Sequence, residues 1–180
     1  MKKFKVQADR ILLRTLTIED SESLYHYRNI PEVSVFQGWT PISPKEVSDY
    51  AIAMANRETF NYGDWYQIVI QDKKRQVLGD LGVCIDTETN QQAELGVALD
   101  PRFQKQGFAT DAVKLICKFL FTEKNIRRIH VSIDPRNTAS LNLFARTGFR
   151  QEAHHIESVF FKGEWCDDIV MALLKSEWRK

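Results

Sequence analysis

The sequence has little cysteine, and nothing in it groups residues as a metal site would. Cys84, Cys117 and Cys166 are far apart and form no CxxC pair, which argues against a disulfide framework or a cysteine zinc site. Reduced, buried thiols are expected instead, as in cytosolic proteins. The four histidines show no metal-ligand spacing with acidic residues, so no bound metal is expected.

Long apolar runs and a large net charge are also absent from the sequence. No run could span a bilayer, and no apolar segment follows the basic start MKKFKVQADR, so neither a membrane span nor a signal peptide is predicted. The 25 Lys and Arg residues nearly cancel 24 Asp and Glu residues, which leaves a net charge of +1. Such a balance gives no general attraction to nucleic acid or to membranes. We therefore predict a cytoplasmic protein without either partner.

The composition of the chain is that of an ordinary globular protein. The chain has 180 residues, of which 43% are hydrophobic and 27% are charged. This length suits one compact domain over residues 1–180. The sequence contains no repeat and no linker-like tract, so no internal boundary is predicted.

Hydrophobic periodicity and turn residues predict the order strand, two helices, three strands, helix, strand, helix, two strands. Strands are expected at 11–13, 66–70, 77–85, 95–99, 129–133 and in two stretches between 149 and 174. Helices are expected at 17–29, 43–54, 107–120 and 137–148, the second opened by a capping box of Ser43 and Glu46. The strand-helix-strand passage from 95 to 133 within a mostly antiparallel set indicates a mixed, twisted α/β sheet of the α+β type, with helices on its faces.

One segment between a predicted strand and a predicted helix could hold a pyrophosphate. It comprises Gln104, Lys105, Gln106, Gly107, Phe108, Ala109 and Thr110. The first turn of a helix has unpaired N–H groups and partial positive charge, both of which attract phosphate. Gly107 would let the backbone approach a ligand without a Cβ, and Arg102 adds charge nearby. Taken alone, the segment could equally be a simple connection.

A second segment, from Asp134 to Ser140, follows a strand and opens the helix that Gly148 closes. By itself this is a capped helix that needs no ligand. The spacing between the two segments favours a shared binding site over two unrelated connections.

Together the two segments resemble the GNAT superfamily of acetyltransferases. The acetyl-CoA motif of that family, Gln/Arg-x-x-Gly-x-Gly/Ala, reads Gln104-x-x-Gly107-x-Ala109 here, and its later Asn and Gly-Phe match Asn137 and Gly148-Phe149. The resemblance covers almost the whole chain. Residues 10–14 (RILLR), 93–96 (AELG), 163–165 (GEW) and 177–178 (EW) are similar to the branch that holds RimJ/RimL-type ribosomal-protein N-terminal acetyltransferases and spermidine acetyltransferases.

The resemblance implies that acetyl-CoA, as co-substrate, lies between two splayed parallel strands. The strand with Val97, Ala98 and Leu99 would separate from the strand at 129–133, and its backbone would pair with the pantetheine arm. A backbone N–H of this strand would polarise the thioester carbonyl. Asn137 would contact the pantetheine arm from the other side.

One position departs from the wider family. Many members have a tyrosine four residues before the helix-ending glycine, which protonates the departing thiolate, and here that position is Phe144. Ser140, one helical turn earlier, could donate the proton instead, and this arrangement resembles that of the RimJ/RimL-type branch. Ser140 could also be an ordinary first-turn serine.

The acetyl acceptor must be a neutral amine, so a general base is expected. Glu94 is the first candidate, acting through a water, although it could instead pair with an arginine or lie at a solvated strand end. Asp80 is the second candidate. His154 and His155 would point to opposite faces of a strand, and one of them could reach the site.

The acceptor is expected to be a primary amine, foremost the N-terminal α-amino group of a protein or peptide. A polyamine or an aminoglycoside is the alternative, for which Asp167 and Asp168 could supply carboxylates. The resemblance places Trp39, in the aromatic loop 36–41, at the wall of the acceptor site. A third hypothesis is a CoA-binding module without turnover. The oligomeric state is not predicted, and both a monomer and a homodimer are consistent with the sequence.

Overall fold

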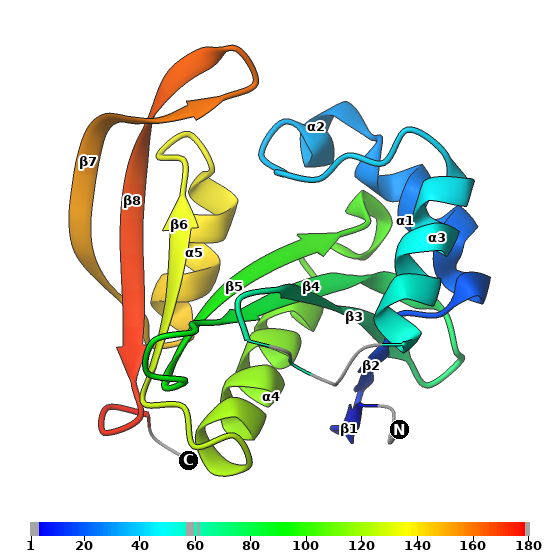
Figure 1. Ribbon diagram of the computed structural model, residues 1–180, viewed down its shortest axis with the longest axis horizontal. Helices are drawn as coiled ribbons and strands as arrows, with labels where there is room; N and C mark the ends of the chain where they lie inside the picture. Colours follow the sequence, from blue (N-terminus) through cyan, green and yellow to red (C-terminus); the bar gives the residue numbers. More distant parts are fainter. Residues whose placement is uncertain (1–3, 57–59, 61, 179–180) are drawn as a thin grey trace.

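The computed structural model describes residues 4–56, 60 and 62–178, and an eight-stranded sheet runs through them (Figure 1). The strand order is β1-β2-β3-β4-β5-β6-β8-β7. The strands are β1 (Lys5–Gln7), β2 (Ile11–Thr15), β3 (Trp65–Asp72), β4 (Val77–Ile85), β5 (Gln92–Leu99), β6 (Arg128–Ile133), β7 (Arg150–Phe161) and β8 (Glu164–Leu174). Neighbouring strands among these are antiparallel except for the parallel pair of β5 and β6.

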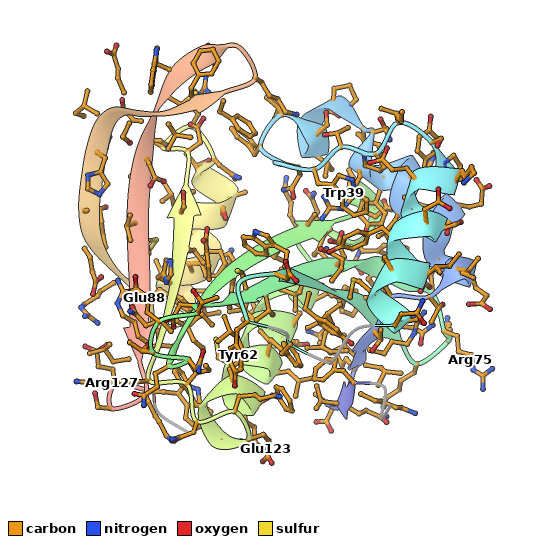
Figure 2. All side chains as sticks on the ribbon, viewed as in Figure 1. Trp39, Tyr62, Arg75, Glu88, Glu123 and Arg127 are labelled. Atoms are coloured by element: carbon orange, nitrogen blue, oxygen red, sulfur yellow. The ribbon has the colours of Figure 1, made fainter. Side chains whose placement is uncertain are left out.

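Helices cover both faces of the sheet (Figure 1). They are α1 (Ser21–Arg28), α2 (Pro31–Ser34), α3 (Pro44–Ala55), α4 (Phe108–Thr122) and α5 (Thr138–Arg146), with 3-10 turns at Ile18–Asp20 and Pro101–Phe103. The larger core packs α4 and α5 against one face, and the smaller core packs α1 and α3 against the other. Side chains fill both layers, while Arg75 projects outward from the turn between β3 and β4 (Figure 2).

The predicted fold class and element order are confirmed, with two additions. The three-residue strand β1 pairs with β2, and the four-residue helix α2 begins at Pro31. Both are too short to show a hydrophobic period, so neither was predicted. No helix in the described part of the chain combines the length and the apolar character needed to cross a membrane. All three cysteines are free; Cys117 and Cys166 are buried, whereas Cys84 is only partly covered.

The predicted capping box at the start of α3 forms only in part. The Ser43 hydroxyl accepts from the Glu46 N–H at 3.2 Å, as expected for an N-cap. The Glu46 carboxylate, however, accepts from Ile42 N at 2.8 Å and from Trp39 Nε1 at 2.9 Å. Glu46 therefore fixes the loop that carries Trp39 to the start of α3.

The parallel strands β5 and β6 pair over only three positions. Their register joins Gln92 to Arg128, Ala93 to Ile129 and Glu94 to His130. Beyond Glu94, β5 continues to Leu99 along β4, while β6 continues along β8. The two strands splay as the family resemblance implied, so the edge of β5 that faces β6 is open from Leu95 onward.

Candidate active site

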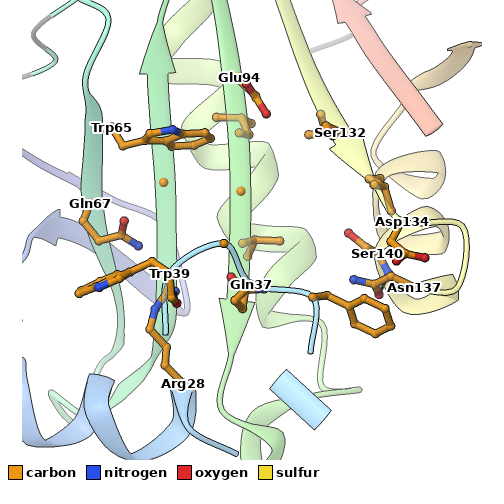
Figure 3. Close-up of a pocket in the computed structure, with 18 of the residues that line it drawn as sticks. Arg28, Gln37, Trp39, Trp65, Gln67, Glu94, Ser132, Asp134, Asn137 and Ser140 are labelled. Carbon is orange, nitrogen blue, oxygen red and sulfur yellow. Dashed lines mark hydrogen bonds between the residues drawn. The ribbon is translucent and has the colours of Figure 1, made fainter. Parts of the chain in front are cut away.

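A cavity of about 680 Å³ lies where β5 and β6 separate. Figure 3 shows Arg28, Trp39, Trp65 and Gln67 on one side of it and Asp134, Asn137 and Ser140 on the other. Glu94 lies between these two walls, next to Ser132 (Figure 3). The predicted site residues that line the cavity are Trp39, Glu94, Val97, Asn137 and Ser140.

The remaining predicted binding residues lie beyond the cavity, at the far end of β5. Ala98 and Leu99 are buried in the sheet. The Gln104 side chain donates from Nε2 to the Leu99 carbonyl at 3.2 Å, which ties the loop 104–107 to the end of this strand. The open edge of β5 thus connects the cavity to the loop, an arrangement that suits an extended ligand.

The loop 104–107 turns sharply before α4. Lys105 (φ 59°) and Gly107 (φ 85°) both adopt the left-handed conformation, and Gly107 is the N-cap of the fifteen-residue helix α4. Glycine adopts this conformation without a steric cost. Phe108, Ala109 and Thr110 form the first turn of α4, so the N-terminal N–H groups of a long helix meet the loop here.

Glu94 lies in surroundings that disfavour its ionised form. Burial raises the pKa of Glu94, and the negative charge of Asp168 adds to this. His130 Nε2 lies 3.9 Å from the carboxylate, but burial lowers the pKa of His130, which disfavours the imidazolium that an ion pair with Glu94 would need. Among the described residues, no arginine lies within ion-pair distance of Glu94.

Asp80 is placed differently from Glu94, because no part of it is exposed. It accepts hydrogen bonds from Tyr27, Arg28 and Gln67. Arg28 in turn donates to the Trp39 carbonyl at 2.8 Å and lies over the Trp39 ring at 4.9 Å. Asp80 therefore holds Arg28, and Arg28 holds the aromatic loop, while the carboxylate itself has no access to an acceptor. This geometry favours Glu94 over Asp80 as the base.

The cavity lining contains none of His154, His155, Asp167 and Asp168. On β7, His154 Nε2 is 2.9 Å from Asp167 Oδ2, and Asp167 also accepts from Glu157 N. Asp168 accepts from the Ser132 hydroxyl at 2.7 Å and from Ile133 N at 3.0 Å. Within the described ranges, no group of three or more His, Cys, Asp or Glu side chains is placed as a metal site requires.

The first turn of α5 forms the opposite wall of the cavity. Asn137 caps this helix by accepting from Ser140 N at 3.1 Å. Ser140 and Phe144, one turn apart, both line the cavity, and Phe144 packs against Phe149 with ring centroids 5.0 Å apart. No residue in the described part of the chain makes a hydrogen bond to Ser140 Oγ. The hydroxyl is therefore available to a ligand.

Trp65 was not singled out from the sequence, yet it forms part of the cavity wall. Gly82 and Gly96 face each other on β4 and β5, and a Cβ at Gly82 would lie 2.8 Å from the Trp65 ring. The glycine therefore makes room for the indole to lie against the sheet. A glycine inside a strand indicates such a close approach, but only the strand register identifies the partner.

Comparison with known proteins gives one consistent result. Residues 10–150 match the family model described as Acetyltransferase (GNAT) domain. The chain is 28% identical over 171 residues to the "Uncharacterized N-acetyltransferase p20" of Bacillus licheniformis, covering 94% of this chain and 96% of the relative.

Two solved structures are similar in fold. Ribosomal-protein-S5-alanine acetyltransferase from Vibrio fischeri has a TM-score of 0.82 at 18% identity, covering 98% of this chain and 100% of that one. Spermidine N-acetyltransferase from Vibrio cholerae, in complex with CoA and spermine, has a TM-score of 0.80 at 21% identity, covering 93% and 96%.

Proposed function

Because the chain belongs to the GNAT family and is an acetyl-CoA-dependent N-acetyltransferase, we propose that its acceptor is the N-terminal α-amino group of a protein or peptide. The observation that carries this choice is the charge of the cavity. Among the described residues, three side chains of the lining are charged at neutral pH: Arg28, Glu94 and Asp134. Two of these three are neutralised by ion pairs. Arg28 pairs with Asp80, and Asp134 pairs with Arg136 at 2.6 Å.

Glu94 is then the one cavity carboxylate without a charged partner among the described residues. A single carboxylate can neutralise a single ammonium group. An N-terminal residue with an uncharged side chain carries one such group. A polyamine would bring further ammonium groups into the cavity, whose described lining offers no second unpaired carboxylate, and a buried charge without a partner costs free energy. The charge count therefore favours the α-amino group of a peptide.

Small polyamines are the second candidate, because the Vibrio cholerae neighbour is a spermidine N-acetyltransferase solved with spermine. The carboxylates that could have supported them here are Asp167 and Asp168. Asp167 accepts a hydrogen bond from Glu157 N within the hairpin of β7 and β8, and Asp168 accepts from Ser132 on β6. Neither carboxylate lines the cavity. We therefore expect polyamines to be poor acceptors.

In the proposed reaction, acetyl-CoA lies along the open edge of β5. The pantetheine arm would pair with the backbone at 97–99, and the pyrophosphate would meet the loop 104–107 and the first turn of α4. The acceptor nitrogen attacks the thioester carbonyl carbon, so a C–N bond forms as the C–S bond breaks. Glu94 receives the ammonium proton through a water, and Ser140 donates a hydrogen bond to the departing thiolate.

An acceptor panel tests the proposal with CoA thiol release as the readout. The panel holds peptides with a free N-terminus, the same peptides blocked at the N-terminus but containing lysine, polyamines and an aminoglycoside. We expect kcat/KM for free N-termini to exceed that for polyamines at least about tenfold, a difference of roughly 1.4 kcal/mol in transition-state stabilisation. Equal or faster release with polyamines, or with the blocked peptides, would refute the α-amino assignment.

The loop before α4 supports a prediction about cofactor affinity. In Gly107→Val, a branched side chain would have to adopt φ 85°, and its Cβ would lie 2.9 Å from Arg10 Nη2. We expect the Kd for acetyl-CoA, measured by titration calorimetry, to rise at least about tenfold. Gly163→Val is the matched control, because Gly163 has φ 93° with open space around it, far along the chain in the turn between β7 and β8. An unchanged Kd for Gly107→Val would show that this loop does not bind the pyrophosphate.

A further inference from the structure

Arg10, which precedes β2, lies against the loop 104–107 and the first turn of α4, about a hundred residues further along the chain. We propose that Arg10 is a positioning residue for acetyl-CoA: it orients the loop backbone and neutralises Asp111, so that the N-terminus of α4 can accept a pyrophosphate. This role does not depend on which amine is the acceptor.

One guanidinium group makes three kinds of contact with this segment. Arg10 Nη1 donates to the Gln106 carbonyl at 3.1 Å. Its Nε donates to Asp111 Oδ2 at 2.9 Å, and Nη2 contacts the same oxygen. The guanidinium carbon also lies 5.0 Å from the centroid of the Phe108 ring. Arg10 thus contacts both the loop and the first turn of the helix.

The bond to Gln106 determines which way the next N–H group points. The peptide unit between Gln106 and Gly107 is planar and trans, so its C=O and N–H point in opposite directions. Because Arg10 holds the carbonyl, the Gly107 N–H points away from Arg10. No residue in the described part of the chain accepts a hydrogen bond from this N–H. It is therefore available to an anion on the other side of the loop.

The ion pair removes an electrostatic conflict. Asp111 is an acidic residue in the first turn of α4, where the helix dipole would otherwise attract an anionic ligand. An unpaired carboxylate there would repel a pyrophosphate. The side chains of Arg10 and Asp111 are 49% and 33% exposed, and ion pairs that exposed contribute little to folding. The pair thus matters more for the charge at the loop than for stability.

The experiment measures acetyl-CoA affinity by calorimetry in Arg10→Gln, Asp111→Asn and the double variant. We expect Arg10→Gln to raise Kd about tenfold, through the freed carbonyl and the unpaired Asp111 together. Asp111→Asn alone should bind acetyl-CoA within about threefold of the unchanged chain, and the double variant should recover at least about threefold of the loss. A Kd unchanged in Arg10→Gln, or a double variant no better than Arg10→Gln, would overturn the proposal.

A second readout separates positioning from a general structural effect. Acetyl-pantetheine carries the thioester but no pyrophosphate. Arg10→Gln should therefore keep kcat/KM for acetyl-pantetheine within about twofold while lowering that for acetyl-CoA. Equal losses with both donors would overturn the proposal. If Arg10→Gln does not fold, Arg10→Lys takes its place in the comparison of the two donors, because it keeps the charge beside Asp111 but loses the forked donor geometry that holds the Gln106 carbonyl.

The outcome is independent of the proposed acceptor, because the calorimetry contains no acceptor at all. For the kinetic comparison, any amine that the unchanged chain acetylates is sufficient. A failure of the peptide assignment in the acceptor panel would therefore leave this test intact.

Discussion

Glu94→Gln is expected to lower kcat about a hundredfold while the Kd for acetyl-CoA stays within about twofold. General bases contribute about 10²–10⁴-fold to a rate, and the lower end applies to an α-amino group. Such an amine has a pKa of about 7.7–8.0, so part of it is already neutral near neutral pH. Glutamine keeps the size of the side chain and loses the basic oxygen. The measurement is steady-state kinetics with the best peptide acceptor.

The raised pKa of Glu94 predicts in which direction activity changes with pH. A base acts when it is ionised, and both burial and Asp168 raise the pKa of Glu94. Activity that depends on Glu94 should therefore be lost as the pH falls through this raised pKa, at a higher pH than an ordinary glutamate would give. On the acidic limb, the slope of log kcat/KM against pH should be smaller by about one in Glu94→Gln than in the unchanged chain, because one proton fewer has to be lost.

Asp168→Asn is the matched variant for the electrostatic cause. The amide keeps an oxygen that can accept from Ser132 and Ile133 N but removes the charge that raises the pKa of Glu94. The acidic limb should then move to lower pH while kcat at its plateau changes little.

Wild-type rates in Glu94→Gln at low and neutral pH would exclude Glu94 as the base. Bulk water would then be the acceptor of the ammonium proton.

Ser140→Ala should lower kcat by about ten- to a thousandfold with little change in acetyl-CoA affinity. The hydroxyl lines the cavity at the N-terminal turn of α5, where the helix dipole also favours a developing negative charge. A thiolate is a good leaving group, so the serine has to donate a hydrogen bond rather than transfer its proton fully. The loss should therefore lie within or just below the usual range for one donor.

Two further variants sharpen the test of Ser140. Thr138→Ala is the control in the same helical turn, because Thr138 is exposed and lies outside the cavity lining. Phe144→Tyr supplies a phenol one turn further along the same wall. If Ser140 donates to sulfur, Phe144→Tyr should restore part of the activity of Ser140→Ala. Full activity in Ser140→Ala would reduce the serine to an ordinary helix residue.

The local features of the fold could be predicted because they depend on near neighbours in the chain. Ser43 and Asn137 cap their helices as expected. Gly107 and Gly148 adopt positive φ at the start of α4 and after α5. Caps, turns and hydrophobic period depend on residues three or four positions apart. The splay of β5 from β6 came from the family resemblance, and the single-domain organisation over residues 1–180 remains a prediction.

The roles of individual acidic and aromatic residues required the tertiary structure. Asp80 and Glu94 were both candidate bases, and only packing buries Asp80 beneath Arg28 and leaves Glu94 at the cavity. Trp65 lies over Gly82 because strand register brings β3, β4 and β5 side by side. Burial and register are set by contacts across the sheet, which no local pattern contains.

The sequence by itself determined the order of elements, the helix caps and the glycine loop before α4, since each depends on residues adjacent in the chain. The tertiary structure alone decided which distant groups share a site. Arg10 meets Asp111 across 101 positions, and the Lys162 ammonium reaches the Ser34 carbonyl across 128. Such pairs depend on how the sheet aligns its strands, because a long stretch of chain between two residues does not fix the distance between them.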